Sequence, residues 1–219
     1  MRPLFALVFA LILLSGCAVS SINVLEKKDT PKPFSKIMVV YVDGDIDFAV
    51  FDSLTYNICI RPSFMDTAGR GNTESIICNG LSSPRSAFMR SSDYFDSGFN
   101  SYGIFSADLD SLGVDAILLV HLHRYTYTKH QTPSYVYPLN SGNPTYSLGT
   151  RVTYWTPNAA FGCWLIRPHE FLPVWRAEVD VKGKGYINGK HVLRNDMVEK
   201  LENTLVIGGY IAPHRSENP

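Results

Sequence analysis

Two predominantly apolar runs, residues 37–42 and 114–122, constrain the fold of this chain most strongly. The first reads Ile-Met-Val-Val-Tyr-Val and the second Val-Asp-Ala-Ile-Leu-Leu-Val-His-Leu. Neither run alternates between apolar and polar residues, which is typical of strands that are buried on both faces. Such strands occur in sheets that helices cover, so the two runs predict central strands of an α/β sheet.

The second half of the chain predicts an antiparallel meander and a closing helix. Strands are expected at residues 150–155, 160–167 and 172–182, with turn residues at 156–158 between the first two. A capping box of Asp196 and Glu199 opens the helix, and Gly208-Gly209 ends it. A helix is also expected at 48–60, and residues 66–86 are expected to form a loop with a short strand at 75–78. Together these elements predict an α/β (α+β) single domain, with a mixed sheet of about five to six strands and helices packed on it.

The amino terminus carries an export signal. Arg2 precedes an apolar run from Leu4 to Leu14, which is too short to span a bilayer, and the run ends in Leu14-Ser15-Gly16-Cys17. This tetrapeptide resembles the lipobox of bacterial lipoproteins, in which cleavage leaves the cysteine as a lipidated first residue. Cys17 is therefore the expected lipidation site. The alternative is an ordinary signal peptide in which Cys17 is incidental.

These signals divide the chain into a signal peptide at residues 1–16, a lipidated Cys17 with a flexible tether at 17–35, a globular domain at 36–211 and a loose tail at 212–219. By resemblance to enterobacterial sorting, Ala18 favours the periplasmic face of the outer membrane. We therefore expect the lipid on Cys17 to bind the membrane, and an envelope protein to be the partner of the globular domain.

Charge and cysteine content narrow the function further. Twenty basic residues balance twenty acidic ones, so no basic excess favours nucleic acid as a partner. Cys59 and Cys78 are the expected disulfide pair, because a short polar loop separates them and the compartment is oxidising. Cys163 lies in an apolar run and is expected to be a small buried residue.

Three groups of side chains are candidates for a site. His121 and His123 lie two residues apart on one strand face, where they form either part of a metal site or a pair of packed histidines. Carboxylates alternate over residues 43–47, but the calcium-loop pattern fails at later positions, which favours a plain turn. Tyr135, Tyr137 and Tyr146 belong to a long polar stretch, which forms either a partner surface or a loop folded back on the sheet.

Two segments resemble a family of envelope lipoproteins. Residues 113–120 read Gly-Val-Asp-Ala-Ile-Leu-Leu-Val, and Val174-Trp175-Arg176 follows on a later strand. The segments are similar to those of the curli-secretion pore lipoprotein and of the amino-terminal domain of the Tol β-propeller protein. That resemblance covers about half of the mature chain and implies an accessory or assembly lipoprotein that binds envelope components.

The sequence carries none of the spacings typical of hydrolases, neither Gly-x-Ser-x-Gly nor His-Glu-x-x-His. We therefore expect a binding, assembly or structural role without catalysis and without a cofactor. The alternatives are an envelope hydrolase or a metal-binding sensor that uses His121 and His123.

Overall fold

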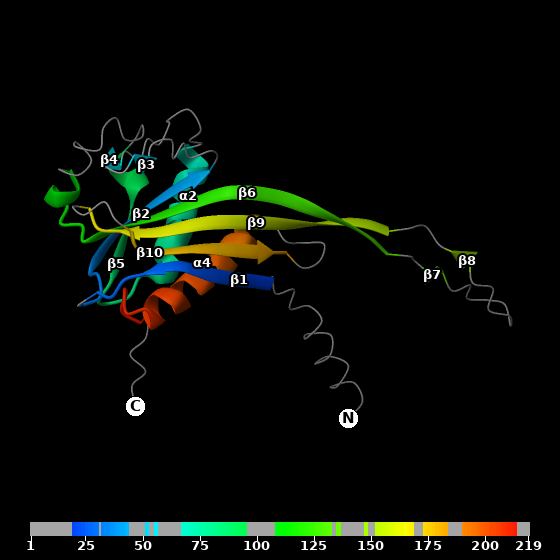
Figure 1. Ribbon diagram of the computed structural model, residues 1–219. Helices are drawn as coiled ribbons and strands as arrows, with labels where there is room; N and C mark the ends of the chain where they lie inside the picture. Colours follow the sequence, from blue (N-terminus) through cyan, green and yellow to red (C-terminus); the bar gives the residue numbers. More distant parts are fainter. Residues whose placement is uncertain are drawn as a thin grey trace, which may run out of the picture.

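The computed structural model describes residues 19–30, 32–43, 51–52, 55–56, 67–95, 108–132, 135–136, 147–148, 152–168, 173–183 and 190–213. They form a single mixed α/β domain, which confirms the predicted fold class. Its six-stranded sheet has the order β1-β10-β9-β6-β2-β5 (Figure 1). Strand β6 is parallel to β2 and β2 is parallel to β5, whereas the other neighbours are antiparallel. The bounds are β1 Val19–Lys27, β2 Lys36–Asp43, β5 Ala87–Arg90, β6 Ala116–Thr132, β9 Val152–Ile166 and β10 Pro173–Lys182.

The two central strands lie where the sequence predicts them, whereas two of the three predicted meander strands are one strand, β9. Strands β2 and β6 contain the two apolar runs, and β6, β9 and β10 form the antiparallel meander. The predicted break at residues 156–158 is wrong, because β9 continues through it. Pairing with β6 extends along both sides of that point, so the sheet ladder overrides the local turn residues.

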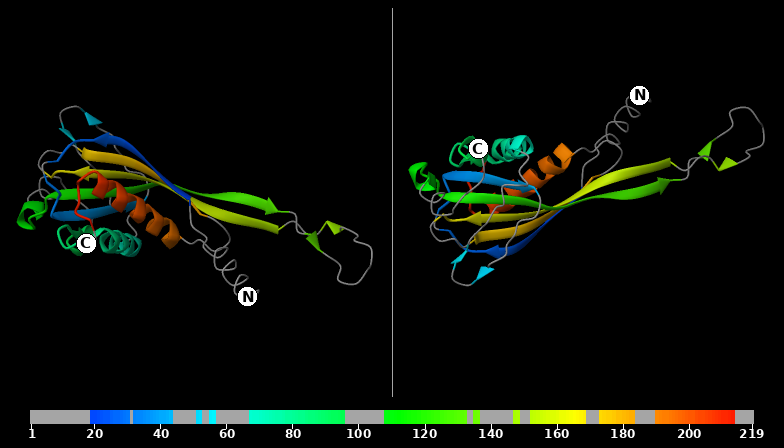
Figure 2. Two further views of the ribbon diagram at one scale, coloured as in Figure 1. Left: turned by 90° about the horizontal axis from the view of Figure 1, so that it is seen from below. Right: turned by 90° about the horizontal axis from the view of Figure 1, so that it is seen from above.

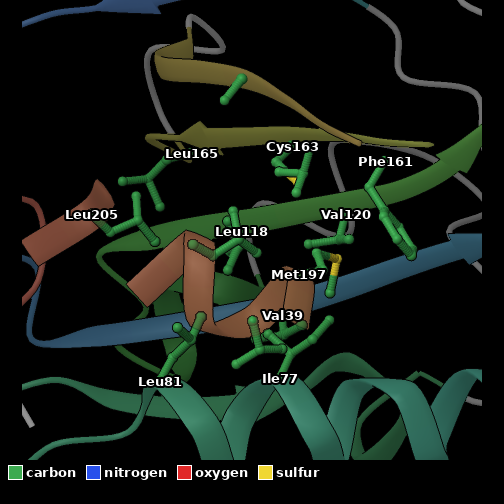
Figure 3. Close-up of a cluster of buried hydrophobic side chains, with 14 of the residues drawn as sticks. Val39, Ile77, Leu81, Leu118, Val120, Phe161, Cys163, Leu165, Met197 and Leu205 are labelled. Carbon is green, nitrogen blue, oxygen red and sulfur yellow. The ribbon is translucent and has the colours of Figure 1, made fainter. Parts of the chain in front are cut away.

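Two helices, α2 (Thr67–Leu81) and α4 (Lys190–Ile207), cover the same face of the sheet (Figure 2). The main core lies between them and the sheet (Figure 3). The helices approach closely at Gly80, where a Cβ atom would lie 2.3 Å from Cγ1 of Val198. The core side chains drawn in Figure 3 include Val39, Ile77, Leu81, Leu118, Val120, Phe161, Cys163, Leu165, Met197 and Leu205.

Helix α2 replaces the loop and short strand that the sequence predicts over residues 66–86. Its buried residues recur with a helical period, but the first ones are polar: Arg70, Thr73 and Glu74 precede Ile77 and Leu81. The apolar stripe therefore extends over only about one helical turn, and the glycines among these residues weaken the helix signal further. The loop and short strand predicted over residues 66–86 are therefore wrong.

The helix predicted at residues 48–60 is also wrong at its described residues. Strands β3 (Phe51–Asp52) and β4 (Thr55–Tyr56) pair with each other there. The aromatic and β-branched residues of this stretch favour extended backbone. Of residues 43–47, for which the sequence favours a plain turn, Asp43 ends β2 and residues 44–47 lie outside the described residues.

A smaller cluster covers the other face of the sheet near the start of β6. A helical turn at residues 108–111 places Leu109 against the outer side chains of β2 and β6. The cluster contains Met38, Val40, Val42, Leu109, Val114, Ile117, Leu119 and Ile166. No helix within the described residues is long and apolar enough to cross a membrane.

Strand β1 forms where the sequence predicts part of a flexible tether. Residues 19–27 pair with β10 from Val19 opposite Lys182 to Lys27 opposite Trp175, with a register shift between Val24 and Glu26. Ile22 packs against the core, whereas Val24 is 40% exposed. One half-buried apolar residue is too weak a pattern to predict an edge strand from the sequence. The strand is stabilised by its pairing with β10 instead.

Asp115 ties the start of β6 to the start of β2. Its carboxylate accepts hydrogen bonds from the backbone N–H groups of Ser35 at 2.9 Å and Lys36 at 3.1 Å, and from the Ser35 hydroxyl. Partial burial opposes ionisation of Asp115, but these hydrogen bonds outweigh it and hold the pKa of the carboxyl below its usual value.

We expect Asp115→Asn to lower the free energy of unfolding by about 1 kcal/mol at neutral pH, because part of this hydrogen bonding is lost. A lowered folded-state pKa stabilises the fold above the unfolded pKa of about 3.9, and that contribution is lost as the pH falls through the folded value. Urea unfolding at several pH values should therefore show a shallower acid dependence for the variant. The exposed Asp108→Asn is the control, and an equal change in both variants would contradict the assignment.

Candidate functional site

A β-bulge in β6 shifts the alternation of its side chains by one residue, so the even-numbered side chains face one side of the sheet before the bulge and the other side after it. Leu122 pairs with Phe161 and Arg124 with Ala160, so His123 is the extra residue. Before the bulge, even-numbered side chains such as Leu118 and Val120 face the helices. After it, Tyr125 packs against the main core, and the even-numbered residues face the side without helices.

Beyond the bulge, β6 and β9 leave the domain as a two-stranded ribbon (Figures 1 and 2). We define the ribbon as residues 124–132 and 152–160, whose pairing runs from Arg124 opposite Ala160 to Thr132 opposite Val152. Strand β10 accompanies it only as far as Lys182, which pairs with Asn158. The short strands β7 (Tyr135–Val136) and β8 (Ser147–Leu148) pair with each other in the segment that connects β6 to β9.

An open groove of about 730 Å³ lies on the helix-free face of the ribbon, where β10 ends. Its walls and floor come from β6, β9 and β10, and polar side chains dominate. Because the ladder fixes which side chains share a face, one register determines the whole lining. The groove is lined by Arg124, Thr126, Thr128, His130, Tyr154, Thr156, Asn158, Ala159, Asp180, Val181, Lys182 and Gly183.

Contacts across the strands hold the groove side chains in place. The Asn158 amide donates to the Thr128 hydroxyl at 2.7 Å, and a ring nitrogen of His130 lies 2.9 Å from the Thr156 hydroxyl. The His130 and Tyr154 rings stack, with centroids 4.8 Å apart and an interplanar angle of 13°. The groove therefore presents a supported aromatic surface beside hydroxyl and amide groups.

The charges at the mouth of the groove nearly balance. The Arg124 guanidinium donates to Asp180 at 3.2 Å, and the two side chains are 63% and 49% exposed. Lys182 adds one further positive charge on the same face. A solvent-exposed pair of this kind contributes little to stability, at about 0–1 kcal/mol. Its groups are accessible to a ligand.

The opposite face of the ribbon is aromatic. Tyr127 is 57% exposed and Trp155 is 54% exposed, and Lys129 lies over the Trp155 ring at 5.7 Å. The Tyr125 hydroxyl donates to the Tyr127 hydroxyl at 3.2 Å. Burial, followed by that hydroxyl contact, raises the pKa of Tyr125 to about 12, so the Tyr125 hydroxyl keeps its proton at neutral pH.

His121 and His123 lie close together, as the sequence predicts for residues on one strand face. Their ring centroids are 5.9 Å apart and tilted by 47°, and His121 is buried whereas His123 is exposed. Within the described residues, no group of three His, Cys, Asp or Glu side chains could hold a metal ion.

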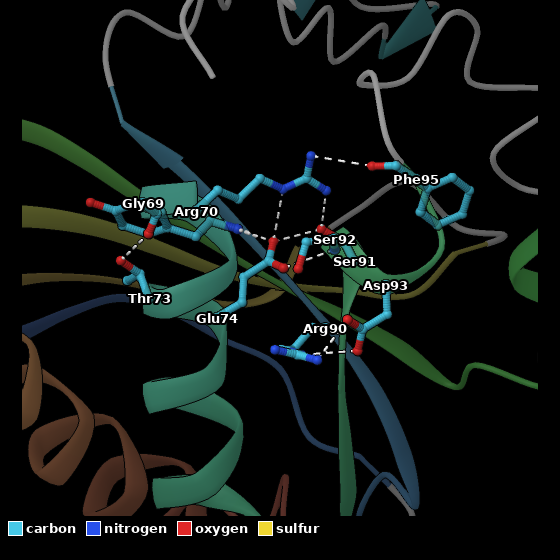
Figure 4. A network of polar contacts seen from close by, with 10 residues as sticks. Gly69, Arg70, Thr73, Glu74, Arg90, Ser91, Ser92, Asp93 and Phe95 are labelled. Carbon is cyan, nitrogen blue, oxygen red and sulfur yellow. Dashed lines mark hydrogen bonds and ion pairs between the residues drawn. The ribbon is translucent and has the colours of Figure 1, made fainter. Parts of the chain in front are cut away.

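A buried ion pair lies far from the groove, between α2 and the 3-10 helix η2 (Ser91–Asp93) (Figure 4). The Arg70 guanidinium donates to Glu74 at 3.1 Å and to the Ser91 hydroxyl at 2.6 Å. The same carboxylate accepts from the backbone N–H groups of Tyr41 and Ser92 and from the Ser91 hydroxyl. Since all of these bonds are internal, the network fixes α2 rather than offering a ligand site.

The remaining predicted site residues have mixed outcomes. Cys78 and Cys163 are buried and form no disulfide with another described residue, and burial raises the pKa of each thiol, that of Cys78 to about 12. Cys17 and Cys59 lie outside the described residues, so lipidation and the Cys59–Cys78 bridge stay predictions. Tyr137 and Tyr146 also lie outside them, and Tyr135 is placed only as part of β7.

The sequence did not point to the groove. Thr126, Thr128 and His130 alternate along β6, as do Tyr154, Thr156 and Asn158 along β9. This alternation is the available signal. Recognising one polar surface also requires the pairing of β6 with β9, which the structure supplies.

Comparisons with known proteins yield structural neighbours only. No protein-family model matches the sequence, and no curated protein matches it. PelC from Paraburkholderia phytofirmans, solved as a dodecamer, matches over 88% of this chain and 99% of its own, with 10% identity and a TM-score of 0.47. Lipoprotein GNA1162 from Neisseria meningitidis matches over 79% of this chain and 99% of its own, with 11% identity and a TM-score of 0.42. Similarity this distant assigns no family, ligand or partner, and the resemblance to the curli and Tol proteins stays a prediction.

Proposed function

We propose that this chain is a non-catalytic binding lipoprotein of the cell envelope, whose groove receives a saccharide. The observation that carries this proposal is the supported polar groove on the helix-free face of the ribbon. The lipobox ending in Cys17 supports an envelope location, and Ala18 after it favours the periplasmic face of the outer membrane.

The composition of the groove favours a ligand with many hydroxyl groups. Threonine hydroxyls and the Asn158 amide can each donate and accept hydrogen bonds, as sugar hydroxyls do. The stacked Tyr154 ring offers an apolar surface for the C–H groups of a sugar ring. The charges of Arg124 and Asp180 offset each other, which favours a ligand of low net charge over a nucleic acid.

A protein ligand fits this groove less well. Protein interfaces bind through a centre of buried aromatic or aliphatic side chains, whereas most of the side chains that line this groove carry a hydroxyl, amide or charged group. The backbone groups of the floor are already paired within the sheet, so an extended peptide cannot add a strand there. An envelope protein partner would therefore bind another surface.

Binding of defined oligosaccharides to the soluble mature domain tests the proposal. The probes are two neutral oligosaccharides, an N-acetylhexosamine tetramer and a glucose tetramer, and binding is followed by NMR titration. We expect shifts confined to groove residues, and about tenfold weaker binding for Asn158→Leu and for Tyr154→Leu, since each loses contacts of about 1 kcal/mol or more. Tyr127→Leu, on the opposite face of the ribbon, should bind as the parent does.

Two outcomes would refute the saccharide assignment. The first is the absence of binding by both probes at millimolar concentration. The second is equal affinity in the groove variants and in Tyr127→Leu, because binding would then lie elsewhere on the molecule.

A further inference from the structure

The ribbon has two unlike faces, and only one of them belongs to the groove. We call residues Tyr125, Tyr127, Lys129 and Trp155 the aromatic face. Tyr127 pairs with Pro157 and Lys129 with Trp155, two residues apart along the ladder, so their side chains point to the same side as the core-packed Tyr125. Tyr127 and Trp155 are each more than half exposed, and Lys129 is exposed beside them.

The start of β1 lies close to the base of this ribbon. Val19 pairs with Lys182, Lys182 with Asn158, and Asn158 with Thr126, which forms one row across four strands. At about 4.8 Å per strand, the row spans about 15 Å. Cys17 precedes Val19 by two residues, a reach of at most about 7 Å.

Any lipid on Cys17 is therefore held beside the base of the ribbon rather than at the end of a long tether. From this row, β6 continues for six residues to Thr132, about 20 Å. The aromatic face lies along this extension, so its side chains and the lipidated residue belong to the same end of the molecule.

We propose that the aromatic face rests on the headgroup layer of the bilayer that holds the acyl chains of Cys17. This inference rests on the lipid anchor of the proposed function. Tryptophan and tyrosine favour the membrane–water interface, where the ring is in an apolar environment and its polar atom stays hydrated. Lys129 can extend its ammonium group to lipid phosphates while its chain lies along the Trp155 ring.

The anchor makes a small contact surface sufficient. Once Cys17 is inserted, binding of the aromatic face is intramolecular and benefits from a high effective concentration. Because successive side chains of a strand point to opposite faces, this orientation turns the groove away from the lipid. The anchored protein would then present its groove to the periplasm.

Tryptophan quenching by brominated lipids tests this orientation. Lipidated protein is reconstituted into phosphatidylethanolamine–phosphatidylglycerol vesicles, with bromine near the headgroup end of the acyl chains. Trp175 is buried, and Trp164 faces the side of the sheet opposite α2 and α4, so Trp155 should dominate the quenching. We expect quenching at least twofold greater for the parent than for Trp155→Phe. Lys129→Glu should reduce it, whereas Lys182→Glu on the groove face should not.

The readouts separate failure of the anchor from failure of the orientation. Intact-mass measurement that finds Cys17 unmodified overturns the lipid anchor, together with the orientation that depends on it. A modified Cys17 with no quenching of Trp155 overturns the orientation alone. A concentration-dependent blue shift without vesicles, with dimers in sedimentation, would show that a second copy covers the aromatic face instead and would also overturn it.

Discussion

Replacing Glu74 with alanine should lower the free energy of unfolding by about 3–5 kcal/mol, because it leaves the Arg70 guanidinium buried without its charge partner. Arg70 and Glu74 have side chains that are only 3% and 0% exposed. The carboxylate also satisfies the backbone N–H groups of Tyr41 on β2 and Ser92 on η2, so its loss uncouples α2 from two neighbours (Figure 4). Urea denaturation followed by circular dichroism measures the effect.

Two further variants make this prediction specific. Arg90 and Asp93 form an ion pair with side chains 41% and 43% exposed, so Asp93→Ala should cost less than about 1 kcal/mol. The double variant Arg70→Met with Glu74→Leu should recover much of the lost stability, because it removes both charges from the buried site. A double variant as unstable as Glu74→Ala would mean that the charge pair is not the cause.

Trp175→Ala should cost a similar amount, about 3–5 kcal/mol, for a different reason. Trp175 is 1% exposed on β10 and is the largest of the fully buried side chains that the structure describes. Its removal leaves a cavity between the sheet and the helices that neighbouring strands cannot close without breaking their ladders. The melting temperature should fall accordingly.

Trp155→Ala provides the matched control, since it removes the same side chain from an exposed position on the ribbon. Its effect on the free energy of unfolding should stay within about 0.5 kcal/mol. Comparable losses in both tryptophan variants would contradict the packing described here.

The central strands could be predicted because burial on both faces requires a run of apolar residues, which is visible in the sequence. Apolar and polar residues do not alternate in 37–42 and 114–122. This pattern is typical of a strand whose two faces are both buried. Residues 173–182 alternate clearly, and their burial follows that alternation along β10. In both cases local composition and tertiary position agree.

Helix α2, strand β1 and the groove could not be predicted in the same way, because their stabilisation is non-local. Arg70 and Glu74 look like surface residues in the sequence, and only their partners on η2 and β2 make their burial favourable. Strand β1 depends on its ladder to β10. The groove depends on the register of three strands and on the bulge, and no local sequence pattern predicts either of them.

The bulge at His123 has a consequence for how this arm can vary between related sequences. Because it is a single unpaired residue, its deletion would join Leu122 directly to Arg124 and leave the pairing beyond it, from Arg124 opposite Ala160 onward, unchanged. Arg124 and Thr126 would still face the groove, and Tyr127 would stay on the opposite side. One codon in the middle of β6 can thus be lost without inverting what lies distal to it, and a longer insertion in the segment that connects β6 to β9 would leave that polarity untouched as well.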